Sequence, residues 1–198
     1  MKTAANNANL GGDDSNTFKI TIIPIHMATE ALDTTGILSA TSDAISQITD
    51  LMSAVDEDKV NTVPYEGSWT APQLLRHVTK SINGMTRAMQ MEAKPAKRDP
   101  SERIDELKKI FLDFSKKLTQ PDFIVPEERI YEKQSSIEEL NKSFSRFKES
   151  AAGANLDDLI EGLPLGPITK LEIIHFVLYH TQRHLHQMKK ICEALKNK

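Results

Sequence analysis

Apolar residues recur three or four positions apart along most of this chain, the spacing that places them on one face of an α-helix. No strand pattern competes with this periodicity, and no internal repeat is present. The pattern therefore predicts an all-α protein, built as a helical bundle with short to medium connections. The predicted helices cover, to within a few residues, 28–55, 70–89, 101–118, 135–152 and 169–196.

Two of these helices carry strong start signals. Thr70 and Gln73 form the residue pair of a capping box, in which each side chain accepts a hydrogen bond from the backbone N–H of the other residue. Pro72 follows in the first turn, where its missing N–H is not needed. Thr169 and Glu172 form the same pair before the last helix. We therefore expect both helices to begin at these caps.

The N-terminal segment lacks this helical pattern. Residues 1–17 are rich in Asn, Gly, Asp and Ala and offer almost nothing to bury, so we expect a disordered tail. Residues 18–27 have a strand-like composition but only loose alternation and an internal Pro24. We expect them to form an extended arm on the bundle or on a second subunit. The beginning of the first helix stays open, because residues 33–36 interrupt its pattern.

Length, charge and cysteine content narrow the class of protein. The 198 residues include 28 acidic and 25 basic ones, interspersed, so no nucleic-acid-binding surface is predicted. No apolar run approaches the roughly 20 residues that cross a bilayer, and the first residues lack the apolar core of a secretory signal. Cys192 is the single cysteine, which excludes an internal disulfide framework and fits a reducing compartment. We expect one domain, residues 18–198, in a cytoplasmic protein.

Two histidines of the last helix are the strongest candidates for chemistry. His180 and His184 are four residues apart, so they share a helix face and both imidazoles can reach one ion. They fall near the middle of that helix's apolar stripe. Burying an unpaired imidazole costs free energy, and a metal ion is the partner that would use both rings. The alternative is a pair of hydrogen-bonded histidines that bind no metal.

The remaining histidines divide into one further candidate ligand and three others. His77 lies two turns inside the second helix, at the edge of its apolar stripe, and is the best third ligand. His26 lies in the predicted arm. His175 and His186 face away from the stripe and lie roughly 16 Å apart along the helix, so we interpret them as solvated or interface residues.

A three-histidine site would leave coordination positions open, which is typical of catalytic rather than structural zinc. Such an ion can lower the pKa of a bound water or thiol and polarise a carbonyl. Imidazole also suits Ni and Fe, so the identity of the divalent metal stays open. Glu66 and Glu172 are conceivable partners of the rings, but we favour a loop charge and a helix cap for them. For Gln187, on the inward face, we favour a structural role.

These residues resemble a known family, the DinB-like superfamily. The resemblance rests on W-T-x-x-x-L-L-x-H at residues 69–77 and on the C-terminal H-x-x-x-H in HTQRHLHQ. It covers about residues 28–197 and is closest at 69–77 and 163–188. The chain departs from the family in its N-terminal tail and arm and in a long insertion at residues 94–134, which contains the additional predicted helix.

The resemblance implies a four-helix bundle of up-up-down-down topology. It also implies a divalent metal, Zn, Ni or Fe, held by His77, His180 and His184, with water in the remaining positions. Characterised members transfer or isomerise groups with low-molecular-weight thiols, and homodimers are common in the family. No residue of this chain can be matched to thiol binding.

Two functional hypotheses follow. The first is a metal-dependent enzyme of the DinB-like superfamily, a hydrolase or a thiol-dependent transferase that acts on a small molecule. The second is a non-catalytic, dimeric metal-binding or stress-associated bundle. The residues leave open whether the protein is an enzyme, and they assign no catalytic residue beyond the proposed ligands.

Overall fold

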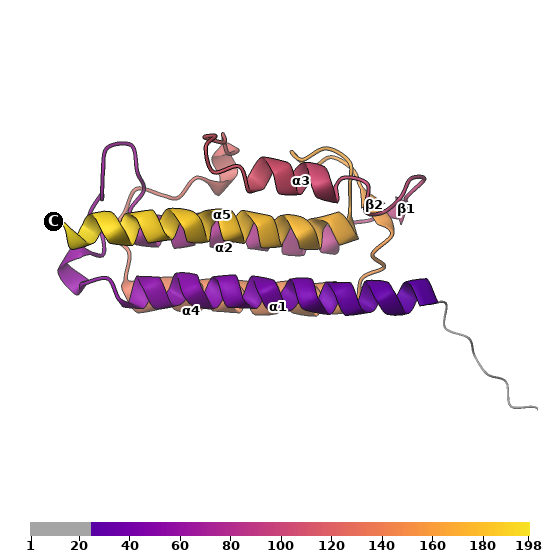
Figure 1. The fold of residues 1–198 in the computed structure, drawn as a ribbon, viewed down its shortest axis with the longest axis horizontal. Coiled ribbons are helices and arrows are strands. Elements are labelled where there is room, and N and C mark those ends of the chain that lie inside the picture. Colours follow the sequence, from indigo (N-terminus) through magenta and orange to yellow (C-terminus); the bar gives the residue numbers. More distant parts are fainter. Residues whose placement is uncertain (1–24) are drawn as a thin grey trace, which may run out of the picture.

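The computed structural model describes the backbone of residues 25–198 and the side chains of residues 34–198. Four long helices form a bundle of two layers, with α1 beside α4 in one layer and α2 beside α5 in the other (Figure 1). The most extensive helix contacts join the two layers, between α1 and α5 and between α2 and α4. The bundle helices are α1 (Ile25–Ser53), α2 (Ala71–Met89), α4 (Lys133–Ala152) and α5 (Lys170–Lys196).

All four helices contribute to one hydrophobic core. The apolar faces of α1 and α4 in one layer point into it, and so do those of α2 and α5 in the other. Removing this apolar surface from water is the main stabilisation that holds the helices together. Fully buried side chains of the core include Ile48, Met52, Leu74, Leu75, Leu140, Phe147, Ile173 and Ile174.

Helices α1 and α5 run in the same direction, and α4 runs against them (Figure 1). The Cys192 Sγ, near the end of α5, lies 3.6 Å from the carbonyl oxygen of Leu51, near the end of α1. At the start of α4, the Lys133 ammonium donates a hydrogen bond of 2.7 Å to the carbonyl of Val55, just beyond the end of α1. These contacts fix which helix ends meet.

Helix α2 runs parallel to α4. Arg76, early in α2, pairs with Glu139, early in α4, at 3.3 Å. Further along both helices, Arg146 donates to the Asn83 side chain at 3.0 Å. In chain order the directions are therefore up, down, down and up, which corrects the up-up-down-down order that the resemblance implied.

Connection length explains this order. A parallel pair needs a connection that returns along the whole helix, roughly 28 Å for the 19 residues of α2. Residues 90–132 form such a connection, between α2 and α4. The shorter segments 54–70 and 153–169 turn the chain around directly and join antiparallel helices.

Both predicted capping boxes are confirmed. The Gln73 backbone N–H donates to the Thr70 hydroxyl at 3.4 Å, and the Thr70 N–H donates to the Gln73 side chain at 3.0 Å. The corresponding distances for Thr169 and Glu172 are 3.1 and 2.9 Å. The caps satisfy backbone donors that the first helical turn leaves without partners, so α2 and α5 begin where the sequence predicts.

The start of α1 differs from the prediction. The helix begins at Ile25, so the last three residues of the predicted arm are helical and residues 33–36 do not interrupt it. A glycine inside a helix, here Gly36, costs only about 1 kcal/mol. Packing of α1 along α5 outweighs such a cost. The predicted tail and residues 18–24 lie outside the described residues.

The helix predicted at 101–118 is shorter in the structure. Helix α3 spans Ile104–Phe111 and packs on the outside of α5 (Figure 1). The Asp113 carboxylate accepts hydrogen bonds from the Ser115 N–H at 3.1 Å and from its hydroxyl at 2.6 Å. This local turn offers the backbone an alternative to the helix, which explains why α3 ends early.

A small sheet corrects the expectation that strands are absent. The strands β1 (Lys94–Pro95), β2 (Asp158–Ile160) and β3 (Ile168–Thr169) pair antiparallel in that order. Strands of two or three residues are too short to show an alternating pattern. The sheet ties the insertion to the connection before α5. No helix in the described part of the chain has the length and apolar character needed to cross a membrane.

Candidate metal centre

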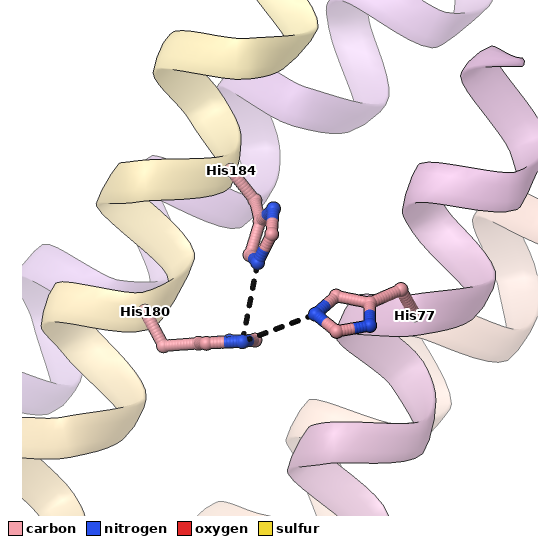
Figure 2. A group of neighbouring side chains, drawn as sticks. All are labelled: His77, His180 and His184. Atoms are coloured by element: carbon pink, nitrogen blue, oxygen red, sulfur yellow. Dashed lines mark hydrogen bonds between the residues drawn. The ribbon is translucent and has the colours of Figure 1, made fainter. Parts of the chain in front are cut away.

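Three buried histidines from two helices, α2 and α5, converge on one point between them (Figure 2). The His77 Nε2, on α2, lies 3.3 Å from the His180 Nε2, on α5. The His184 Nε2, one turn further along α5, lies 3.1 Å from the same atom. One ring nitrogen from each histidine lies within 4.8 Å of the other two. In the described part of the chain, no other cluster of His, Cys, Asp or Glu has metal-site geometry.

The antiparallel packing of α2 and α5 brings these rings level. His77 lies twelve residues before the end of α2 at Met89, roughly 18 Å along the axis. His180 and His184 lie ten and fourteen residues after the start of α5, roughly 15 and 21 Å along it. Because the end of α2 lies near the start of α5, the same distance from that end places all three rings together (Figure 1).

Hydrogen bonds fix the tautomers of two of the rings. The His77 Nδ1 lies 3.0 Å from the carbonyl oxygen of Ile124, in the short 3-10 helix η2 (Asp122–Ile124) of the insertion. A carbonyl only accepts, so the proton of neutral His77 is on Nδ1. The His184 Nδ1 lies 3.1 Å from the side-chain oxygen of Gln187, which assigns its proton in the same way. Both Nε2 atoms then present a lone pair.

The three Nε2 atoms cannot satisfy one another. Two of them present lone pairs towards the His180 Nε2, which carries at most one proton. A divalent cation accepts all three lone pairs. Metal–nitrogen bonds of about 2.0–2.1 Å at tetrahedral angles put ligand nitrogens roughly 3.3 Å apart. The separations from the His180 Nε2, 3.3 Å to His77 and 3.1 Å to His184, are close to this value, and the ring nitrogens of the third pair lie within 4.8 Å, so the residues fit a metal ion.

The surroundings keep the rings neutral, the form that binds metals. Burial lowers the pKa of His77 to about 4, although the bond to the Ile124 carbonyl partly opposes this. Burial lowers the pKa of His180 and of His184 well below the ordinary value, and the neighbouring histidines lower both further. Protons therefore compete weakly for these nitrogens near neutral pH.

A cavity of about 820 Å³ opens onto the histidine cluster. This volume is typical of small-molecule sites. Residues of α2, α5 and the insertion form its walls, and Trp69, Phe111 and Phe176 supply aromatic surface. The exposed rings of Phe114 and Phe123 also line it. The nitrogens at its base are thus accessible to a ligand that enters from solvent.

Of the three residues considered as partners of the rings, only Gln187 contacts one of them. Gln187 contacts His184 directly, so it orients a site residue, contrary to the purely structural role that the sequence favoured. Glu66 is exposed and lies outside the cavity wall. Glu172 is fully buried, but it binds Arg98 at 2.7 Å and caps α5. The predicted cap role of Glu172 is therefore confirmed.

The prediction for His175 is wrong, because its side chain is only 5% exposed. Its Nδ1 lies 3.3 Å from the Tyr179 hydroxyl. His186 is half-buried, and its ring stacks on Phe114 with 4.3 Å between ring centroids. The short insertion segment that supplies Phe114 covers this side of α5. For His26, the side chain lies outside the described residues.

Two contributions to the site were not found from the sequence. The Ile124 carbonyl orients His77, but every residue type has a backbone carbonyl, so the sequence could not identify this one. The centroid of the Trp69 ring lies 4.8 Å from that of the His77 ring, so Trp69 packs directly against a site residue. Its position in the W-T-x-x-x-L-L-x-H motif was the available signal.

The profile of the DinB superfamily matches residues 40–188, which include all three histidines of the cluster. Searches of curated proteins and of solved structures found no match.

Proposed function

The chain belongs to the DinB superfamily, and from this premise we propose that it is a metal-dependent enzyme whose ion is held by His77, His180 and His184. One observation carries the proposal: the Ile124 carbonyl and the Gln187 amide direct two Nε2 lone pairs at a third ring nitrogen. The metal is divalent, and imidazole ligands admit Zn, Ni or Fe.

When bound, such an ion supplies a Lewis acid that lowers the pKa of a water or thiol and polarises a carbonyl. The protein's own residues orient the ligands and shape the cavity. Ile124 and Gln187 hold two rings, and Trp69 packs on one side of His77. The open cavity admits a small molecule, so the reaction class that fits is hydrolysis or transfer with a low-molecular-weight thiol.

Metal content tests the proposal directly. We expect the purified protein to carry about one metal equivalent per chain by elemental analysis, and a His77→Ala/His180→Ala/His184→Ala variant to carry almost none. His186→Ala is the matched control, because this histidine also lines the cavity but lies outside the cluster. Equal metal content in the wild type and the triple variant, with helicity retained, would count decisively against the site.

A second candidate function is a non-catalytic metal-binding or stress-associated bundle. It is favoured by one observation: the described residues that line the cavity include no Asp, Glu or Cys that could act as a general base or nucleophile. Under this alternative, removing the metal lowers the melting temperature, yet a panel of esters, amides and thiol acceptors shows no turnover in the loaded protein. If the loaded protein turns over a substrate of this panel and the triple histidine variant does not, the result supports the enzyme hypothesis.

We also propose that the protein is a cytoplasmic homodimer. The single free thiol, Cys192, supports the location, because reducing compartments keep thiols free. The dimer rests on the family resemblance alone. Light scattering coupled to size-exclusion chromatography should give about twice the chain mass of 22.2 kDa. A monomer at micromolar concentration would contradict the dimer and leave the metal site untouched.

A further inference from the structure

The cavity walls have a charge composition unlike that of the whole chain. The chain has 28 acidic and 25 basic residues, yet no described acidic side chain lines the cavity. Apart from Tyr65, every described wall residue outside the three-histidine cluster that is charged or titratable is basic. These basic residues are Lys116, Lys117, Arg183, His186 and Lys190.

Two of the three wall lysines have no acidic partner in the described residues. Lys116 forms an ion pair with Asp113 at 3.1 Å. Lys117 and Lys190 form no ion pair with any described carboxylate. Both are exposed at the cavity wall, so their ammonium groups are free to meet a ligand. Their positive charges attract an anion that enters and repel a cation.

Arg183 binds backbone carbonyls of the insertion. Its guanidinium donates to the carbonyls of Phe111 at 3.2 Å and Asp113 at 2.9 Å, and also to that of Lys116. These bonds hold the insertion segment that precedes Lys117 against α5. Because carbonyl oxygens carry no net charge, Arg183 adds to the positive potential of the wall.

The position of Lys190 on α5 gives the distance along the helix axis between this residue and the histidine cluster. Lys190 follows His184 by six residues, roughly 9 Å along the axis. The wall near this stretch of α5 includes Gln187 and the Phe114 ring, which stacks on His186. A ligand that spans from the cluster to the ammonium therefore needs an apolar middle of a few carbon atoms or one ring.

We infer that the cavity binds a small molecule with an apolar or aromatic body and an anionic group, such as a carboxylate, held by Lys117 and Lys190 while the opposite end reaches the histidine cluster. This inference names the substrate class of the proposed function and rests on it for the chemistry. The binding preference itself rests on the wall alone. A lysine ammonium is a compact point charge, so it selects the sign of the charge.

Three matched probes test the preference: 4-phenylbutanoate, its neutral amide 4-phenylbutanamide, and the cation 4-phenylbutylamine. Calorimetry on the full chain, both metal-loaded and after chelation, should give the tightest binding for the carboxylate in both forms. Lys117→Gln/Lys190→Gln should weaken carboxylate binding about tenfold and leave amide binding unchanged. Raising the salt concentration should weaken only carboxylate binding, because the two ammonium groups are exposed.

Lys189→Gln is the matched control, because it removes an exposed charge from the adjacent position of α5 that does not line the cavity. It should leave the binding of all three probes unchanged. The inference is overturned if the amide binds as tightly as the carboxylate, if Lys189→Gln acts like the double variant, or if no probe binds.

Metal analysis of the same samples separates the two claims. A carboxylate preference in protein without metal, before and after exposure to Zn, Ni and Fe, supports the inference and removes the proposed function. A bound metal with no carboxylate preference removes only the inference.

Discussion

At the scale of single residues, the chemistry of the site depends on the hydrogen bonds that two of the imidazoles make through Nδ1, the nitrogen that faces away from the cluster. His77 uses the Ile124 carbonyl, and His184 uses the Gln187 side chain. These partners set the tautomer and the ring orientation, and both raise the basicity of the nitrogen that faces the cluster. The same two contacts explain why three neutral rings can lie close together within the core.

Gln187→Leu should weaken metal affinity about 10- to 100-fold, because the His184 ring loses the group that orients it and holds its proton on Nδ1. Competition with a chromophoric chelator measures this affinity. Gln182→Leu is the control, since Gln182 is on α5 but does not line the cavity. An unchanged affinity in Gln187→Leu would show that the contact does not support metal binding.

At the scale of elements, the insertion between α2 and α4 does more than connect them. Its 3-10 helix η2 supplies the carbonyl for His77, and the segment after α3 forms one wall of the cavity. Two anchors hold the insertion to α5: Arg183 binds the segment after α3, and the Glu172 carboxylate binds the chain before α3.

Arg183→Lys should loosen the segment after α3 without unfolding the bundle. A lysine cannot reproduce the planar fork that binds several carbonyls at once. Hydrogen exchange of residues 112–118 should accelerate, while exchange in α2 and α4 stays the same. Arg146→Lys, at an exposed hydrogen bond between α2 and α4, is the control. Equal exchange in both variants would exclude an anchoring role for Arg183.

Glu172→Gln should destabilise the protein by about 2–3 kcal/mol, less than for a wholly buried pair, because Arg98 is partly exposed. The carboxylate accepts two bonds of 2.7 Å from Arg98 and one of 2.8 Å from the Arg103 N–H. Urea unfolding measures the loss. Glu161→Gln, at an exposed position, should change the free energy of unfolding by less than about 0.5 kcal/mol. An equally small change for Glu172→Gln would contradict the proposal that Glu172 anchors the chain before α3 to α5.

At the scale of the whole molecule, burial of three neutral histidines couples stability to pH. The pKa of His77 is about 4 in the folded protein and near 6.5 in the unfolded chain. Below pH 6.5 the unfolded chain therefore binds protons that the folded state excludes. The contribution to stability is fully present above pH 6.5 and is lost as the pH falls towards 4.

Metal-free protein should thus lose about 2–3 kcal/mol of unfolding free energy between pH 7 and pH 4.5 through His77 alone. Carboxylates with a lowered pKa, such as Glu172, also contribute less to the free energy of unfolding as the pH falls, so their effect has the same sign. His77→Leu isolates the contribution of His77, because the variant keeps the carboxylates but has no titratable group at position 77. Identical pH profiles of the two proteins, by urea unfolding, would refute the coupling.

The long connection at residues 90–132 also has a consequence for the whole molecule. It makes α2 and α4 parallel and at the same time covers the histidine cluster from outside. The same segment therefore determines both the topology and one side of the cavity. Helix packing alone, between α2 and α5, brings the rings together.

Sequence alone determined the features that depend on local geometry. The capping pairs at Thr70 and Thr169 predicted where two helices begin, and helical periodicity placed His180 and His184 on one buried face. These predictions are confirmed, because the helix repeat and its caps involve residues only a few positions apart. The choice of His77 as a third metal ligand stays a prediction, although its ring lies beside that of His180.

Only the tertiary structure decided the helix directions, the burial of His175, the Ile124 carbonyl beside His77 and a cavity wall to which no described Asp or Glu contributes. Each depends on residues far apart in the chain meeting by a path that the connections set. Backbone carbonyls are the same in every residue type, so composition cannot mark the one that orients a ring. Charges such as Lys117 and Lys190 acquire a common role only when folding brings them to one wall.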